Sequence, residues 1–274
     1  MIFPKNPQDA TAHRHHKRSV EVSLIIEHIA KALPQTAAHP ESTLRVLEFG
    51  SGNGFQLPYL KTIGEVVASD LYESEAIRNI DGVRFVKCSI ESTGFGDSQF
   101  DVIFSNHVIE HLERPEDAFR ELKRIGTPTC LYAFAVPTNV WLLLTIPEQY
   151  RAKLRQVRRS APARGMPSGS ENIQAHARDL AAPPVRARDR GQISYGSRLM
   201  RKLLPAGHGV IANFWACYRQ FKVANWEQFF RDHGFSVVGR QPLLLYGPSE
   251  WPIIPTRKNM RNICSSILFL LKKP

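Results

Sequence analysis

A short apolar run followed at once by a glycine cluster is the feature that most limits how this chain can fold. Residues 44–49 fit a buried strand, and glycines stand at positions 50, 52 and 54 directly after it. Glycine lets a backbone turn sharply, and it lets a ligand approach main-chain N–H groups with no Cβ in the way. A strand that ends in such a turn is typical of nucleotide-binding α/β sheets. The spacing is GxGxG, since Phe55 occupies the position where the dinucleotide fingerprint GxGxxG requires glycine.

Further apolar runs extend this strand into a sheet. They predict strands at 66–69, 83–86, 101–105, 129–136, 235–238 and 265–271. Helical patterns separate several of them: one ends before Pro34, one begins at Pro115 and stops at Gly126, and one contains Trp226. The alternation predicts an α/β fold, a doubly wound, Rossmann-like, seven-stranded and mostly parallel sheet with an insertion after the fifth strand.

Polar residues follow three of the predicted strands. Asp70, Ser89 and Asn106 all fall where a strand ends. The carboxyl ends of parallel strands share one edge, and ligands bind there in doubly wound sheets. Asp70 comes 18 residues after Gly52, and a carboxylate at that position can accept both ribose hydroxyls of a nucleoside lying over the glycine turn. The alternative for Asp70 alone is a turn or helix-capping residue.

The segment EFGSGNG at 48–54, together with Asp70, resembles the class I S-adenosylmethionine-dependent methyltransferases. The similarity is strongest to the small-molecule branch, which includes methyltransferase type 11 and ubiquinone-biosynthesis-like enzymes, and it covers about residues 40–137, with weaker support from 213 onward. It implies S-adenosyl-L-methionine as cofactor. In this family Leu71 would pack on the adenine, and Ser89 stands where an acid commonly meets the adenine amino group. The resemblance implies these cofactor-binding residues: Glu48, Gly50, Ser51, Gly52, Gly54, Asp70, Leu71, Ser89, Ile90 and Asn106.

Two histidines follow the fourth predicted strand and are the candidate catalytic residues. His107 and His111 are four residues apart, and an oxygen nucleophile would need a base of this kind to remove its proton. We expect His111, ahead of His107, to act as the base or to orient the acceptor; the alternative is that it packs and stiffens the loop. The run HxxEH also resembles the inverted zinc-protease motif. The sequence shows no third ligand, so no metal is predicted.

The sequence limits the methyl acceptor only through a motif that it lacks. Amino-group methyltransferases of nucleic acids often carry an Asp/Asn-Pro-Pro-aromatic motif, whereas this chain has Ser105-Asn106-His107-Val108. This favours methyl transfer to oxygen or carbon of a small-molecule, glycan or lipid-linked acceptor, which could be anionic. Two alternatives stay open: an RNA-binding methyltransferase or RNA-binding module, and a fold that binds the donor without catalysis.

Positive charge is concentrated in one segment of the chain. Of the net charge of +11, residues 151–202 contribute +10, with thirteen Lys or Arg against three acids. Such a segment could attract anionic acceptors, RNA or a membrane surface, although Tyr195 is its one aromatic residue for base stacking.

We expect an N-terminal helical segment at 1–40, a cofactor-binding core at 41–144, a basic insertion at 145–212 and a C-terminal part of the same domain at 213–274. Isolated cysteines and the lack of a signal or transmembrane segment predict a cytoplasmic protein.

Overall fold

The computed structural model describes residues 7–33, 43–160, 205–246, 254–255 and 263–274. These residues belong to two compact units. The first contains those up to Ile146 and those from Ala206 onward, and the second begins at Pro147. Most of the predicted basic insertion, residues 161–204, lies outside the described residues. The first unit holds the sheet and both cavities discussed below.

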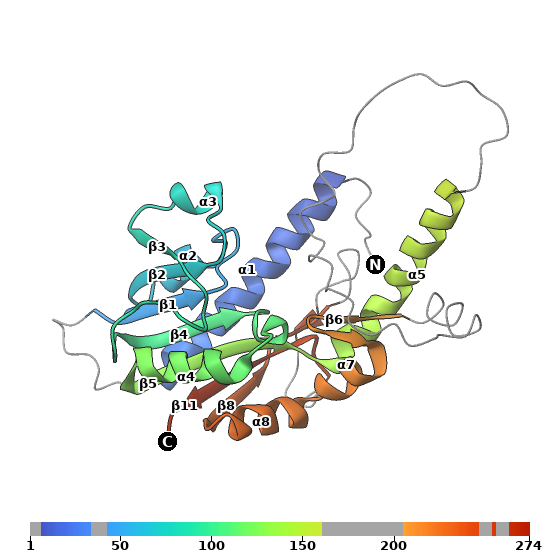
Figure 1. The fold of residues 1–274 in the computed structure, drawn as a ribbon. Coiled ribbons are helices and arrows are strands. Elements are labelled where there is room, and N and C mark those ends of the chain that lie inside the picture. Colours follow the sequence, from blue (N-terminus) through green and yellow to red (C-terminus); the bar gives the residue numbers. More distant parts are fainter. Residues whose placement is uncertain (1–6, 34–42, 161–204, 247–253, 256–262) are drawn as a thin grey trace. The chain divides into compact units, whose positions relative to one another are not determined.

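The sheet of the first unit has seven strands in the order β3-β2-β1-β4-β5-β11-β8 (Figure 1). All pairs on the β3 side of β5 are parallel, and β11 runs antiparallel to both of its neighbours. The strand order reverses between β1 and β4, which is where a doubly wound sheet opens a crevice for a ligand. The predicted fold is confirmed. The strands are β1 (Arg45–Phe49), β2 (Glu65–Asp70), β3 (Val83–Lys87), β4 (Phe100–Asn106), β5 (Gly126–Pro137), β8 (Ser236–Pro242) and β11 (Ser266–Lys272).

Helices and two small strand pairs complete the described residues. The pairs are β6 (Ala206–His208) with β7 (Ile211–Asn213), and β9 (Leu244–Leu245) with β10 (Ile254–Pro255). No helix among the described residues is long and apolar enough to cross a membrane. The helices are α1 (Pro7–Ala32), α2 (Leu57–Leu60), α3 (Glu75–Arg78), the 3₁₀ turn η2 (Ile109–His111), α4 (Pro115–Ile125), α5 (Asn139–Ser160), α7 (Phe214–Gln220) and α8 (Val223–Asp232).

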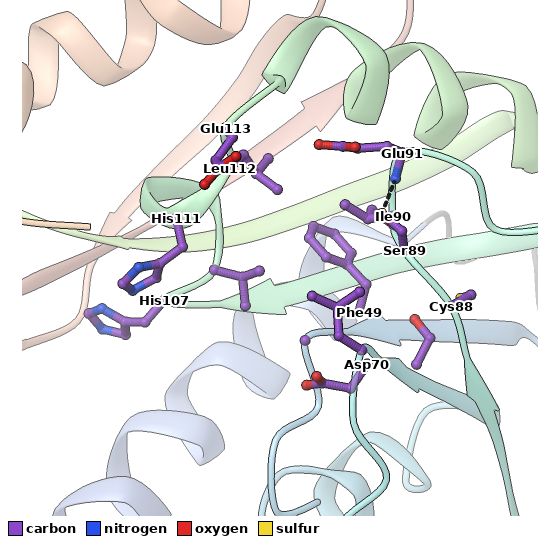
Figure 2. Close-up of a pocket in the computed structure, with 14 residues that line it drawn as sticks. Phe49, Asp70, Cys88, Ser89, Ile90, Glu91, His107, His111, Leu112 and Glu113 are labelled. Atoms are coloured by element: carbon purple, nitrogen blue, oxygen red, sulfur yellow. Dashed lines mark hydrogen bonds between the residues drawn. The ribbon is translucent and has the colours of Figure 1, made fainter. Parts of the chain in front are cut away.

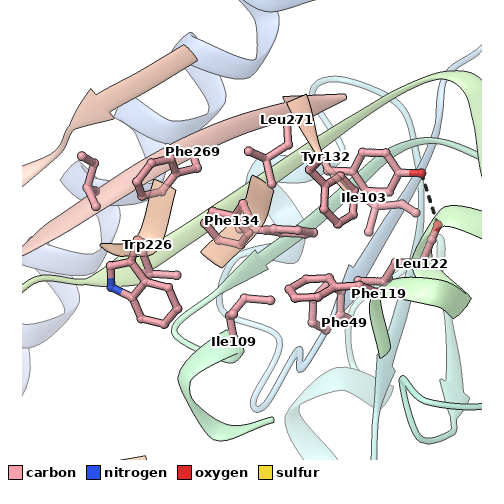
Figure 3. Close-up of a cluster of buried hydrophobic side chains, with 14 of the residues drawn as sticks. Phe49, Ile103, Ile109, Phe119, Leu122, Tyr132, Phe134, Trp226, Phe269 and Leu271 are labelled. Carbon is pink, nitrogen blue, oxygen red and sulfur yellow. Dashed lines mark hydrogen bonds between the residues drawn. The ribbon is translucent and has the colours of Figure 1, made fainter. Parts of the chain in front are cut away.

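The core forms a layer on each face of the sheet because apolar side chains alternate along the strands. On β5, Tyr132, Phe134 and Val136 belong to an aromatic layer with residues of α4, α7 and α8, part of which is drawn in Figure 3. Ala133 and Ala135 face the opposite layer, which contains residues of α1, α2 and α3. Burial on both faces explains why these strands read as continuous apolar runs.

Three local features go beyond what the sequence patterns indicated. The N-terminal segment expected at 1–40 contains the helix Pro7–Ala32, and Lys17 and Arg18 lay their cations over the rings of Tyr246 and Phe55. Residues 145–160 continue α5, in keeping with the good helix propensity of Arg, Lys, Gln and Leu. Gly126 ends α4 as expected, and it does so in an extended conformation. Glycine is required at this position because an added Cβ would lie 2.4 Å from the Tyr132 hydroxyl.

Candidate active site

The glycine turn after β1 is fastened to β2 by main-chain hydrogen bonds. Gly50 N and Ser51 N both donate to Ser69 O, at 2.8 and 3.1 Å. All three glycines have positive φ, from +55° to +75°. Added Cβ atoms would strike Val108 at Gly50 and the side chains around Ile77 at Gly54, whereas nothing lies within 4 Å of one at Gly52. Gly50 and Gly54 are therefore needed for packing, while Gly52 leaves open space beside the backbone.

Asp70 is held directly against that open turn. Its Oδ2 accepts a hydrogen bond from Gly52 N at 2.9 Å, and its Oδ1 accepts one from Tyr72 N at 3.3 Å. The carboxylate is thus fixed at the end of β2, with unused lone pairs on both oxygens. The side chain of Leu71, next in the chain, is 55% exposed.

A cavity of about 540 Å³ lies above these residues (Figure 2). That volume is within the usual range for small-molecule sites. Ser89 borders it, and its Oγ accepts a hydrogen bond from Glu91 N at 3.3 Å. The side chains of His107 and His111 both point to the same side of η2. The predicted site residues that line this cavity are Gly50, Asp70, Leu71, Ser89, Ile90, His107 and His111.

A chain of buried and partly buried polar side chains links β1 to β4. Gln56 Nε2 donates to Glu48 Oε1 at 2.6 Å, and Asn106 Nδ2 donates to Gln56 Oε1 at 2.7 Å. Burial raises the pKa of Glu48 to about 8, so this carboxyl carries a proton at neutral pH. Among the described residues, Glu48 Oε2 and Asn106 Oδ1 have no hydrogen-bond partner. Sequence reasoning missed Gln56, although it follows the glycine turn by two residues.

A second cavity, of about 420 Å³, lies beside the first. The two share Gly50, His107 and His111, and the second also takes in Ser51, Gly52 and Asn106. Of the predicted site residues, Glu48 and Gly54 line neither cavity. Asn53, Phe55 and Gln56, in and just after the glycine turn, also line the second cavity. The rest of its wall comes from segments without any motif that sequence reasoning could have used: Lys17, Arg18 and Glu21 of α1, Trp141 in the first turn of α5, His208 of β6, and Tyr246.

His107 lies at the junction of the two cavities. It adopts φ +57°, a conformation that is uncommon for residues other than glycine. Its Nδ1 is 3.4 Å from Glu110 Oε1, and its Nε2 is 3.3 Å from the Tyr246 hydroxyl. Burial lowers the pKa of His107, but the Glu110 carboxylate outweighs that effect, so the net shift of the pKa is upward. The ring of His111 packs edge-on against that of His208, at 5.1 Å between centroids.

Comparison with known families decides what this arrangement is. Residues 47–134, which span the glycine turn, Asp70 and both histidines, match the family model described as "Methyltransferase domain". The matched residues form a methyltransferase domain, and its cofactor is S-adenosylmethionine, as the sequence predicted.

Solved structures agree with this fold. An S-adenosylmethionine-dependent methyltransferase from Thermotoga maritima aligns with a TM-score of 0.54 and 16% identity, over 96% of this chain and 91% of that one. A chain from the complex between the Haloferax volcanii Trm112 methyltransferase activator and a methyltransferase aligns with a TM-score of 0.51 and 16% identity, over 97% of this chain and 95% of that one. At 16% sequence identity, the similarity to these structures shows a shared fold only. The search of curated proteins found no match.

The groups at the site fit this cofactor. Open space beside Gly52 leaves room for a ligand against the backbone, and Asp70 offers free lone pairs at the rim of the larger cavity. The unpartnered Oδ1 of Asn106, which lines the second cavity, leaves hydrogen-bonding capacity on the other side of the turn. A nucleoside with a polar amino-acid tail would meet hydrogen-bonding groups at both places.

Proposed function

We propose that this methyltransferase transfers its methyl group to a hydroxyl oxygen of a small anionic acceptor. The observation that carries the proposal is the junction of the two cavities at Gly50, His107 and His111. A donor in the 540 Å³ cavity and an acceptor in the 420 Å³ cavity would meet beside His107. Alignment of two bound reactants can account for several kcal/mol of a barrier.

The donor would be held by the predicted cofactor residues. Asp70 would accept hydrogen bonds from the ribose hydroxyls, while Leu71, Ser89 and Ile90 would enclose the adenine. The methionine end would lie toward Gly52 and Asn106, with Ser51 beside them. Glu48 and Gly54 would act from behind this surface, Glu48 through its hydrogen bond to Gln56 and Gly54 by allowing the turn to pack.

The chemistry asked of the chain itself is modest. Bound S-adenosylmethionine supplies a methyl group on a sulfonium, which is already activated. The residues of this chain then have to align the acceptor oxygen, exclude water and take the hydroxyl proton. Geometry favours His107 for the proton, ahead of His111, because a carboxylate orients its Nδ1 and its Nε2 lies at the edge of the acceptor cavity.

The walls of the second cavity support an anionic acceptor. Lys17 and Arg18 project from α1 toward it, each over an aromatic ring. Arg18 lies over Phe55 beside the glycine turn, where it can meet the donor's carboxylate. Lys17 lies over Tyr246, on the acceptor side, and can attract a carboxylate or phosphate there.

An acceptor screen with isotopically labelled S-adenosylmethionine tests this proposal. The panel would pair hydroxyl compounds that carry a carboxylate or phosphate with neutral analogues, and would include amines and short RNAs. We expect methyl ethers, identified by mass spectrometry, from the anionic hydroxyl compounds. Products methylated only at nitrogen, or label only in RNA, would overturn it.

A further inference from the structure

One buried side chain beside the acceptor cavity has no hydrogen-bond partner among the described residues. The carboxyl group of Glu110 on η2 is fully buried, and neither oxygen accepts a hydrogen bond from any described residue. Burying an ionised carboxylate is costly unless it is paired or coordinates a metal. Two imidazoles approach it: His107 Nδ1 lies 3.4 Å and His208 Nε2 lies 3.9 Å from Oε1.

The position of His208 results from a main-chain contact. Gly209 packs against the backbone of η2 so closely that an added Cβ would lie 2.1 Å from Glu110 O. Val210 N donates to the same oxygen at 3.2 Å. This contact fixes the β6–β7 hairpin on η2 and turns His208 toward the Glu110 carboxylate. The Trp141 ring packs edge-on against the His208 ring, with 4.7 Å between centroids.

Glu110, His111 and His208 therefore present three ligand atoms to one point. One atom from each lies within 4.8 Å of the other two. Ligands around a zinc-sized ion lie about 3–4 Å apart, so small side-chain rotations suffice to close the triangle. His107 would stand behind Glu110 and orient its carboxylate, as residues behind metal ligands commonly do.

We propose that Glu110, His111 and His208 bind one divalent cation of the zinc type at the wall of the acceptor cavity. Two imidazole nitrogens and one carboxylate suit Zn²⁺, Co²⁺, Fe²⁺ or Mn²⁺ better than Mg²⁺, which prefers oxygen ligands. Three protein ligands leave a coordination position open, and both histidines line the cavity. The sequence motif HxxEH showed no third metal ligand. The fold brings His208 to Glu110 and His111 as that third ligand.

This site deepens the proposed function and rests on it for its role. The cation would hold the acceptor hydroxyl beside the donor methyl group while His107 takes the proton. The acceptor O–CH₃ bond then forms as the S–CH₃ bond breaks, and the sulfonium becomes the neutral thioether of S-adenosylhomocysteine. One proton is released for each methyl ether made.

Cobalt binding tests the site without any need for the acceptor. Full-length protein freed of metal by chelation would be titrated with Co²⁺, followed by its visible absorption and confirmed by competition with Zn²⁺. We expect one Co²⁺ per chain in a site of low symmetry. His208→Gln and His111→Gln, on different elements, should each weaken binding by about 100-fold or more.

A matched control separates this site from the exposed N-terminal histidines. His15→Gln with His16→Gln should leave Co²⁺ binding unchanged, with folding of every variant checked by thermal melting. Loss of binding in this control alone, or no binding by the wild-type protein, overturns the site. Methyl ether formation that is independent of metal leaves the proposed function standing and removes the site. Co²⁺ binding without any methyl ether product leaves the metal site standing and overturns the proposed function.

Discussion

The proposed donor side and the proposed acceptor side of this enzyme are built in different ways. The donor side comes from one continuous stretch, with its polar groups at the ends of β1, β2, β3 and β4 and its turn fixed by main-chain hydrogen bonds to Ser69. The acceptor side brings together α1, η2, the start of α5, β6 and Tyr246, and its contacts are mostly between side chains. Backbone geometry thus constrains the donor side, whereas tertiary packing alone assembles the acceptor side. The two should respond differently to substitution.

The largest effect is expected at the open face of the glycine turn. Gly52→Val should abolish measurable S-adenosylhomocysteine binding by calorimetry, because the side chain fills the space left for the ligand. Gly94→Val is the control, since Gly94 also has a positive φ and open space but lines neither cavity. Both variants should lose similar stability. Equal affinity in the two would refute the placement of the donor.

Glu48 should make stability fall as pH rises. Its pKa is about 8 in the folded protein against an ordinary value of 4.5, so between pH 5 and 8 the folded state keeps a proton that the unfolded state has lost. The free energy of unfolding should decline across that window, by on the order of 4 kcal/mol in total. Glu48→Gln should remove this slope. Denaturant unfolding at several pH values measures it, and parallel curves for the two proteins would contradict the prediction.

His107 tests whether chemistry lies at the junction of the two sides. His107→Asn keeps a residue that tolerates positive φ but removes the base, so kcat should fall about 100-fold with S-adenosylhomocysteine affinity unchanged. His16→Gln, on the exposed part of α1, should leave kcat unchanged. A lower melting temperature with normal turnover per folded molecule would assign His107 a packing role instead.

Asp70 should affect the donor side alone. Asp70→Ala should weaken S-adenosylhomocysteine binding by roughly 1.5–3 kcal/mol, the scale of hydrogen bonds to a charged group. Asp70→Asn retains an oxygen for one of the two main-chain donors and should lose less. Calorimetry gives both values. Wild-type affinity in both variants would mean that Asp70 serves only the turn.

Lys17 should have the smallest effect, confined to the acceptor side. Lys17→Gln should raise the KM for an anionic acceptor about 5-fold at low salt and less at high salt, because screening weakens the attraction. Donor affinity should stay unchanged. Lys31→Gln, an exposed position on the same helix, is the matched control. An equal KM in both variants at low salt would remove Lys17 from the acceptor site.

The structure also shows why some expectations from the sequence succeeded. The strands predicted from short apolar runs and the helix predicted to begin at Pro115 depend on local patterning, and each appears where it was expected. Contacts between distant segments could not be predicted in this way. The sequence indicates a helical segment at the N-terminus but not the ring partners of Lys17 and Arg18, because Tyr246 and Phe55 are distant in sequence.

The sequence by itself determined the order of strands and helices, the glycine turn and the acid at Asp70, since each is encoded within a few consecutive residues. Only the tertiary structure decided the acceptor side. His208 lies far along the chain from Glu110, and nothing in the intervening residues marks it as a partner. The two meet because Gly209, lacking a Cβ, allows a hairpin to rest on the backbone of η2. A contact of that kind depends on packing between distant segments, which no local pattern of residues records.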